Sequence, residues 1–507
     1  MRSKSSMYNL LAAMGLQIIA LAVGIILPRV MIMSFGSEIN GLVSSIKQFI
    51  SYLTLVEAGL AGACIYSLYK PLADKNYTEI NKILSGAKKF YNRSGIIFSG
   101  LAIILAVIFP YIIRTENISE LTITVLALIL GINGALEFFS MGKYRALLTA
   151  DQKSYIISII QAVGQVLNCT IIVVMALNKC NIVTVQLVAT SSYIVRSILF
   201  SCYVKKKYRF VNFEAEPSKT ALHQRWDVLF HQIGSMVVFN SPIALITFFC
   251  TLIEVSIYTV YNMVFVGING IVGIFNNGLM AGIGDIISRG DTSNLQKVYR
   301  QYECGYYMIV TFIYSCAYVL IIPFISVYTK GMNDASYIRS ELATAFVILG
   351  ILNTLRIPQV TVVNAAGHFK QTRYRALTEV VINIIASLIL VNYLGMIGVL
   401  LGGMCSYTYR TLDFIIYTPK YITKLPISET LVRILRMIIL GAIIITPFKT
   451  IIHIQVNNFI QWIMWGCIVA AWSGIVIFVG NYIIEKSTVR SLINRAFMVL
   501  GRKTRLG

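Results

Sequence analysis

Apolar and polar positions alternate on a long scale along this chain, with apolar runs of roughly 20 residues separated by short polar stretches. A helix needs about 20 apolar residues to cross the hydrocarbon core of a bilayer. The pattern therefore predicts an all-α integral membrane protein with about 14 transmembrane helices. The predicted spans are 10–33, 41–68, 91–113, 121–146, 154–177, 183–204, 231–251, 256–284, 303–327, 341–363, 374–393, 396–418, 431–447 and 458–483. Because no small-residue cleavage site follows the first span, we expect it to be a retained helix rather than a signal peptide.

The composition agrees with this pattern. Of the 507 residues, 57% are hydrophobic and only 13% are charged, and the mean hydropathy is +0.74. Such a balance leaves too little polar surface for a soluble globule of this size.

The basic residues are distributed unevenly between the loops. The net charge is +22, and 33 of the 43 Lys and Arg residues fall in alternate loops, against 5 in the other loops and 5 within spans. This asymmetry follows the positive-inside rule and predicts that both termini are cytoplasmic. It also explains the positive charge through topology and attraction to anionic membrane lipids, so we expect no nucleic-acid partner.

The chain contains an internal repeat with an offset of 214 residues. The pairs Tyr193/Tyr407, Arg196/Arg410, Tyr203/Tyr417, Lys206/Lys420 and Pro28/Pro242 all keep this offset. The predicted segments are an N-lobe of six helices (1–210), a cytoplasmic inter-lobe loop (211–230), a C-lobe of six helices (231–425), two further helices (426–485) and a basic cytoplasmic tail (486–507). An even number of spans gives both lobes the same orientation. We therefore expect a pseudo-two-fold axis along the membrane normal, a site between the lobes and alternating access.

Charged and polar side chains inside the spans are candidate substrate-binding residues, because each is costly in lipid. Arg29 and Lys47 either face the lobe interface or snorkel to the headgroups. Lys47 lies on a polar stripe with Ser51, which favours a cavity wall. Arg356 precedes Pro358, which should loosen the local backbone; this arginine either contacts the cargo or packs.

Three asparagines share one face of the eighth span. Asn262, Asn269 and Asn276 are seven residues apart and either line a cavity or hydrogen-bond between helices. Amide groups suit hydroxyl-rich cargo because they both donate and accept hydrogen bonds.

The twin arginines Arg196 and Arg410 are second-tier candidates. The favoured interpretation is structural anchoring, in which both side chains reach toward the inner headgroups and Arg410 can also pair with Asp413, three residues beyond it. The alternative is a cationic rim that meets a diphosphate when the cavity opens inward.

Acidic residues within the spans are fewer than basic ones. Glu57 and Glu137 are candidates for ion or proton coupling, or they form hydrogen bonds that pack helices. Glu379 is expected to pair with Arg375, four residues earlier.

No residue spacing indicates a metal, a cofactor or an enzyme. The nine cysteines form no CxxC pair and the four histidines have no ligand spacing. The longest loop, about 205–230, contains no DxD pair, so a membrane sugar polymerase is a less favoured interpretation.

Four stretches resemble a known family: "LPRVMIMSFGSEINGL" (27–42), "LVEAGLAGACIYSLYKPLADKN" (55–76), "GKYRALLTADQKSY" (142–155) and "RIPQVTVVNAAGHFKQT" (356–372). They are similar to the Wzx-like polysaccharide flippases of the multidrug/oligosaccharidyl-lipid/polysaccharide (MOP) exporter superfamily. The resemblance implies a protein of the bacterial cytoplasmic membrane that moves an isoprenoid-diphosphate-linked (undecaprenyl-type) oligosaccharide to the outer leaflet. It also implies polysaccharide assembly proteins as a further class of partner, and a monomer is the default expectation.

The main alternative on the same fold is an ion-coupled multidrug exporter. A site for cationic drugs is expected to be dominated by carboxylates, whereas the spans of this chain hold five basic residues.

Overall fold

The computed structural model describes residues 2–57, 60–113, 115, 117–216, 236, 240–452 and 454–503, without the side chains of 2–4, 6, 60–61, 274–281 and 495–503. The predicted inter-lobe loop and the start of the predicted seventh span lie largely outside the described residues. So does the side chain of Asn276.

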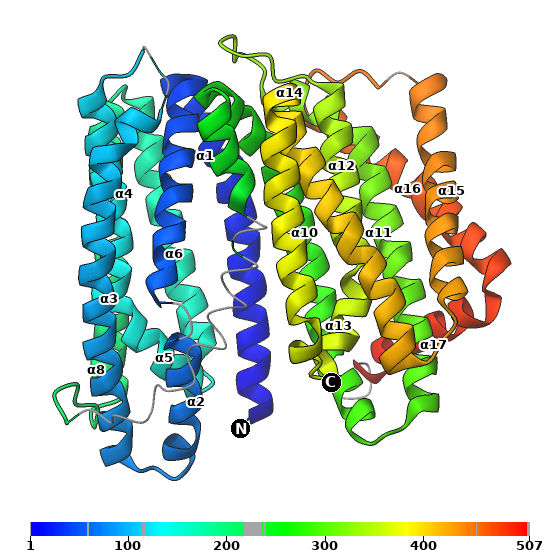
Figure 1. Cartoon of the computed structure of the whole chain (residues 1–507), viewed down its shortest axis with the longest axis horizontal. Helices are drawn as coiled ribbons and strands as arrows, with labels where there is room; N and C mark the ends of the chain where they lie inside the picture. The colour runs from blue at the N-terminus through cyan, green and yellow to red at the C-terminus, as the bar shows by residue number, and fades with distance from the viewer. Residues whose placement is uncertain are drawn as a thin grey trace. The chain divides into compact units, whose positions relative to one another are not determined.

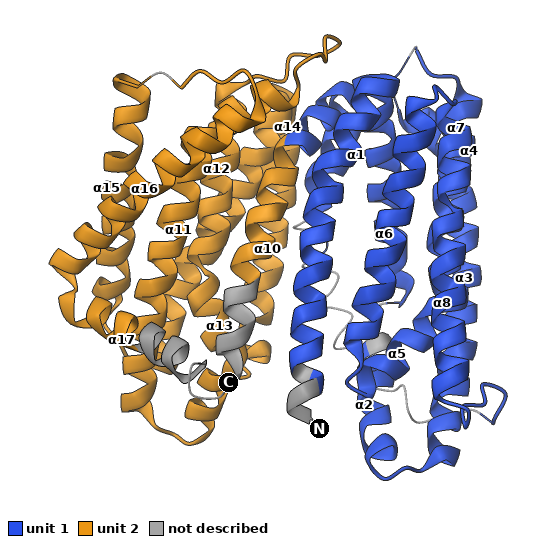
Figure 2. Cartoon of the chain, turned by 180° about the vertical axis from the view of Figure 1, so that it is seen from behind, with its two compact units in different colours: residues 1–260 blue, residues 261–507 orange. Residues whose placement is uncertain are grey.

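Every regular element among the described residues is helical, and the chain forms two compact units, 1–260 and 261–507 (Figures 1 and 2). The elements of unit 1 are α1 (Arg2–Leu53), η1 (Thr54–Glu57), α2 (Leu60–Ala73), α3 (Tyr77–Ile112), α4 (Glu120–Leu136), the π-helical turn η2 (Glu137–Met141), α5 (Gly142–Ala150), α6 (Ser154–Leu177), α7 (Ile182–Ala189), α8 (Ser191–Lys207) and a short helix at Asn240–Phe249. Helix α1 packs along α6, and α3 packs along α4. Leu42, Phe98 and Phe109, none of them accessible, belong to the core between these helices.

Helix α10 (Leu252–Ser288) begins in unit 1 and continues into unit 2. The other elements of unit 2 are α11 (Thr292–Tyr328), α12 (Ser340–Leu355), α13 (Ile357–Ala365), α14 (Phe369–Thr418), the π-helical turn η3 (Pro419–Thr423), α15 (Ile427–Thr450), α16 (Phe459–Ile484) and α17 (Lys486–Lys503). Helix α11 is central because it packs against α12, α15 and α16. The predicted lobe boundaries and the cytoplasmic position of the termini stay predictions.

Eleven helices among the described residues are long and apolar enough to cross a membrane. Two of them bend at a glycine with positive φ, Gly36 in α1 (φ 85°) and Gly395 in α14 (φ 55°), a conformation that a Cβ would disfavour. Each bend falls between two predicted spans, so α1 and α14 each hold two of them. The all-α, multi-pass membrane fold is confirmed, and the count of 14 spans stays a prediction.

The first part of α10 is fixed to the second half of α1 within unit 1. Asn40 donates a hydrogen bond to the hydroxyl of Ser256 on α10 at 2.8 Å, and Ser45 is hydrogen-bonded at 2.7 Å to Thr247, on the short helix that precedes α10. Between them Gly41 lies so close to the backbone that an added Cβ would stand 1.8 Å from the Leu252 carbonyl oxygen. Polar pairs and a small residue are the usual means of close helix packing in a membrane.

The break between α12 and α13 confirms the expected effect of Pro358. Helix α12 ends at Leu355, and α13 begins at Ile357 with the proline in its first turn. Arg356 occupies the break itself. A proline lacks the N–H that would continue the hydrogen-bond ladder, so the helix is interrupted one turn before it.

Candidate functional site: charged clusters on the membrane helices

The first cluster lies in unit 1 around Glu137, the first residue of the π-helical turn η2. Its Oε1 receives Nη2 of Arg196, from α8, at 3.0 Å and Nη2 of Arg145, from α5, at 3.3 Å. One carboxylate thus serves two arginines. π-Helical turns recur at functional sites, and this one places the carboxylate where both side chains reach it.

The stem of Arg196 crosses helix α6 at Gly164. A Cβ on Gly164 would stand 2.2 Å from Cδ of Arg196, so only glycine leaves room for the arginine to reach Glu137. The guanidinium also lies 5.1 Å from the centre of the Tyr193 ring. Arg196 therefore has a structural partner in Glu137, which sequence spacing does not indicate, and its role as an anchor or as a cargo contact stays a prediction.

Glu57 belongs to the same neighbourhood. It is half-buried, it shares a hydrogen bond with the buried hydroxyl of Tyr91, and the charges of Arg145 and Glu137 act on it. The two acids that the sequence nominates for ion coupling therefore lie in one region of unit 1. Whether they couple transport to an ion stays a prediction.

The second cluster lies in unit 2 and contains the twin arginine, Arg410. Its Nη1 contacts Asp413 at 2.8 Å and its Nε contacts Glu379 at 3.4 Å. Arg356 also pairs with Glu379, and Arg375 pairs with Asp413. The expected Arg410–Asp413 pair is confirmed. The expected Glu379–Arg375 pair is wrong: Arg356 and Arg410 hold Glu379, while Arg375 reaches Asp413 on the neighbouring stretch of α14.

Arg356 is engaged on several sides. It is 8% exposed, its guanidinium carbon lies 4.6 Å from the centre of the Tyr407 ring, and its Nη2 donates to Asn353 at 3.2 Å. The break before Pro358 thus directs this arginine to Glu379. A role in cargo contact stays a prediction and would require the arginine to leave these partners.

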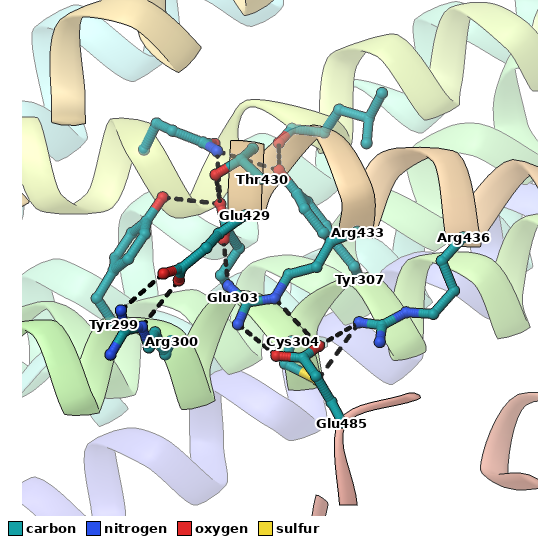
Figure 3. A network of polar contacts seen from close by, with 12 residues as sticks. Tyr299, Arg300, Glu303, Cys304, Tyr307, Glu429, Thr430, Arg433, Arg436 and Glu485 are labelled. Atoms are coloured by element: carbon teal, nitrogen blue, oxygen red, sulfur yellow. Dashed lines mark hydrogen bonds and ion pairs between the residues drawn. The ribbon is translucent and has the colours of Figure 1, made fainter. Parts of the chain in front are cut away.

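A third network, in unit 2, was not anticipated (Figure 3). Glu303 on α11 is 1% exposed and its Oε2 receives Nη1 of Arg433, on α15, at 2.6 Å. Its Oε1 accepts hydrogen bonds from Tyr299, Gln359 and Thr430 at 2.9–3.0 Å. A buried carboxylate with a full set of donors and one arginine is a structural tie between helices.

The network continues to the junction of α16 and α17. Glu485 there pairs with Arg433 at 2.6 Å and with Arg436, and Arg300 pairs with Glu429 at 2.6 Å. Burial alone would raise the pKa of Glu485, but hydrogen bonds and charge from the two arginines lower it to about 2. Sequence reasoning missed these residues because Glu303 is the first residue of the predicted span 303–327, and the two arginines count there among the basic residues at the cytoplasmic end of the span 431–447. Their spacing of three on one apolar helix was the available signal.

The predicted lining residues fall in both units. Lys47 is exposed on α1, with no hydrogen-bond or ion-pair partner among the described residues, and Ser51 exchanges hydrogen bonds with Gln48. On α10, Asn269 is exposed and Asn262 is half-buried. Arg29 is half-buried and has a partner of its own. The lining roles of all these residues, together with Asn276, stay predictions.

The same helix α10 contributes to a packed interior. Phe265 lies 5.2 Å from Phe346 between ring centres and is 5% exposed. Among the described residues, no group of three or more His, Cys, Asp or Glu side chains is placed to hold a metal ion.

Comparison with known proteins places the fold. No protein-family model matches the chain, and no curated protein does. Among solved structures, an inward-facing multidrug resistance MATE family transporter of the MOP superfamily aligns with a TM-score of 0.66 at 13% identity over 82% of this chain and 98% of its own. The lipid II flippase MurJ, in an inward closed conformation, aligns with a TM-score of 0.63 at 16% identity over 94% and 99%. The MATE multidrug transporter DinF-BH aligns with a TM-score of 0.56 at 13% identity over 83% and 97%.

At these identities the likeness shows the fold. This chain is a multi-pass membrane protein with a fold like that of the MATE transporters and MurJ. These neighbours are transporters and a flippase, not enzymes. The resemblance to Wzx-like polysaccharide flippases in particular stays a prediction.

Proposed function

We propose that this protein is a flippase that moves an isoprenoid-diphosphate-linked oligosaccharide from the inner to the outer leaflet of the cytoplasmic membrane. The observation that carries the proposal is the extent of the structural match. The lipid II flippase covers 94% of this chain, whereas the multidrug transporters cover 82–83%. A chain whose length is matched throughout by a flippase of a lipid-linked sugar supports a cargo of the same chemical class.

The charges inside the spans support an anionic cargo. Glu137, Glu379, Asp413 and Glu303 each lie within ion-pair distance of at least one arginine. Lys47, by contrast, is an exposed cation in an apolar helix. A charge in such a place is costly unless it serves a ligand or reaches the headgroups. A diphosphate is the kind of ligand that an exposed ammonium group binds as a point charge.

The membrane potential favours the same direction of transport. With the inside negative, moving a negative charge outward gains about 2.3 kcal/mol per charge per 100 mV. The potential would therefore contribute to net outward movement of a diphosphate-linked head.

Export of cationic drugs is the second candidate. The MATE transporters favour it, since one of them aligns with a TM-score of 0.66. Such a cargo needs a carboxylate that is not already held by an arginine. In the described spans Glu57 comes nearest to that condition, because its hydrogen bond is to Tyr91.

The two functions are separated by reconstituting the purified protein into vesicles. One set carries a fluorescent undecaprenyl-diphosphate oligosaccharide, whose transfer to the outer leaflet is read by chemical quenching, and the other set carries a cationic dye. We expect the lipid to cross and the dye to be retained. Dye transport without lipid transfer would reject the flippase proposal in favour of drug export.

Lys47→Ala tests whether the ammonium group of Lys47 binds the charged head of the cargo. A charge-assisted hydrogen bond contributes about 1.5–3 kcal/mol, so the apparent affinity for the lipid should fall on the order of tenfold or more. Lys82→Ala, an exposed lysine on α3, is the matched control and should transfer lipid like the wild type. Equal transfer by both variants would show that Lys47 does not contact the head of the cargo.

A further inference from the structure

A cavity of about 1080 Å³ opens in unit 2 where α15 begins, α16 ends and α17 starts. Three residues of the third network that Figure 3 shows, Arg433, Arg436 and Glu485, form part of its wall. Such a volume is of the order of a small-molecule site. Among the described side chains, none of the predicted lining residues of the transport path borders it.

The wall of this cavity carries an excess of positive charge. Of the described side chains, five cations border it, against two carboxylates. Arg300, Arg433 and Arg436 are matched by the glutamates of the third network. The two cations that remain are Lys486 and Arg490, both exposed, neither with an ion-pair partner among the described residues.

A buried donor also points to a missing partner. Arg436 is 6% exposed and borders the cavity, and its Nη1 atom is buried without a hydrogen-bond partner among the described residues. A buried guanidinium nitrogen left without an acceptor is costly. An anionic group in the cavity would supply one.

The remainder of the wall combines apolar side chains with side chains that carry hydroxyl groups. Val432, Ile483 and Ile484 border the cavity and are 54%, 74% and 57% exposed. Hydroxyl groups of Ser487 and Thr488, in the first turn of α17, stand on the same wall. The exposed apolar side chains continue along the lipid-facing sides of α15 and α16, where acyl chains would lie.

We propose that this cavity binds the phosphate headgroup of an anionic phospholipid. Lys486 and Arg490 hold the phosphate, and its acyl chains lie over Val432, Ile483 and Ile484. Free inorganic phosphate would use the cations but leave the apolar wall uncovered, so the lipid fits both halves of the site. α17 is an amphipathic basic helix, the kind that lies at the surface of anionic membranes.

Native mass spectrometry on the full-length protein in detergent tests this proposal, with dioleoylphosphatidylglycerol, dioleoylphosphatidylcholine and glycerol phosphate as probes. We expect the anionic lipid to bind at least tenfold more tightly than the zwitterionic lipid. Millimolar glycerol phosphate should not displace it. The double variant Lys486→Ala/Arg490→Ala should bind the two lipids equally.

The matched control is Lys82→Ala/Lys89→Ala, which removes two exposed lysines of α3 and should keep the lipid preference. An equal loss in the control would mean diffuse attraction rather than a site, and no loss in either variant would overturn the proposal. Displacement by glycerol phosphate would assign the cavity to a free phosphate compound. Arg490→Gln and Lys486→Gln, tested singly with thermal unfolding as a check on folding, should each give a partial loss.

Discussion

The twin arginines occupy equivalent positions in the two halves of a repeated chain, but they have different ion-pair partners. Arg196 and Arg410 stand 214 residues apart, yet their partners come from different places. Arg196 depends on Glu137, a carboxylate of the preceding helices, which it shares with Arg145. Arg410 lies between two carboxylates of its own helix α14, Glu379 and Asp413.

The two clusters also differ in how far they are sealed. In unit 1 the side chain of Glu137 is 35% exposed, and the buried Nε atoms of Arg145 and Arg196 lack hydrogen-bond partners among the described residues. In unit 2 the side chains of Arg410 and Glu379 are 7% and 10% exposed, and no buried nitrogen of Arg410 or Arg356 lacks a partner among the described residues. The unit 2 cluster is thus a closed structural tie, whereas the unit 1 cluster has a partly exposed carboxylate and buried donors without partners among the described residues.

The largest expected effect is that of Arg410→Ala. Removing one member of a buried, satisfied ion-pair group costs about 3–5 kcal/mol, because the carboxylates left behind stay desolvated. Arg196→Ala should cost clearly less, since Arg145 remains beside a partly exposed Glu137. Thermal unfolding in detergent measures both, with the exposed Arg209→Ala as control. An equal cost for the two arginines would refute the contrast between a sealed and an open cluster.

Gly164→Ala tests the space that Arg196 needs. The new Cβ would stand 2.2 Å from Cδ of Arg196, and overpacking of this kind costs about 1–3 kcal/mol. Gly100→Ala is the matched control, because an added Cβ there meets no heavy atom within 4 Å. We expect the first variant to lower the unfolding temperature and the second to leave it unchanged or slightly raised. The idea fails if Gly164→Ala is as stable as Gly100→Ala.

Much of the fold followed from the sequence, for a physical reason. Apolar runs of membrane length are a strong and local signal, so the predicted spans 154–177 and 458–483 agree with α6 and α16 to within one residue at each end. For α3 only the C-terminal end agrees, because its first turns are polar and the prediction begins at residue 91. The interruption at Pro358 was also local, because a proline acts on its own helix. The bends at Gly36 and Gly395 lie between predicted spans, although in each case the helix continues directly before and after the glycine.

The partners of the charged residues were less predictable. A pair on one helix turn, such as Arg410 and Asp413, follows from sequence spacing. Sequence spacing pairs Glu379 with the wrong arginine, because its partners come from the break between α12 and α13 and from the far part of α14. Glu303 and Arg433 are 130 residues apart, and no local pattern joins them. Long-range pairing of buried charges depends on how helices pack, which a single sequence does not state.

Glu137→Gln tests the contrast between the two clusters by changing the carboxylate instead of the arginine. The partly exposed Glu137 pairs should contribute little, since exposed ion pairs are worth about 0–1 kcal/mol. We expect Glu137→Gln to keep its unfolding temperature, while Glu379→Gln, at a buried site, loses stability. Flipping of the lipid-linked oligosaccharide should then be assayed in Glu137→Gln. Unchanged flipping would remove Glu137 as a candidate for ion coupling, and destabilisation equal to that of Glu379→Gln would contradict the open character of the unit 1 cluster.

The smallest expected effect concerns acid stability, at a third kind of site. Glu485 lies at the solvent edge of a buried network, and its pKa is held at about 2, below its ordinary value of 4.5, by hydrogen bonds and charge from Arg433 and Arg436 that outweigh the opposing effect of burial. A carboxyl group with a lowered pKa stabilises the folded state fully above pH 4.5, and this contribution disappears as the pH falls towards 2. The wild type should therefore lose unfolding temperature more steeply between pH 4.5 and pH 2 than Glu485→Gln, which has no carboxylate to protonate.

Other carboxylates titrate in the same range, so the difference between variants is the measured quantity. Glu214→Gln, which removes a carboxylate from an exposed loop, is the control and should keep the steep acid dependence of the wild type. At pH 7 the order should be wild type above Glu485→Gln, because only the carboxylate accepts the hydrogen bonds of both arginines in its charged form. As the pH approaches 2 the two curves should converge. Parallel curves throughout would mean that Glu485 is not held as a carboxylate by these arginines.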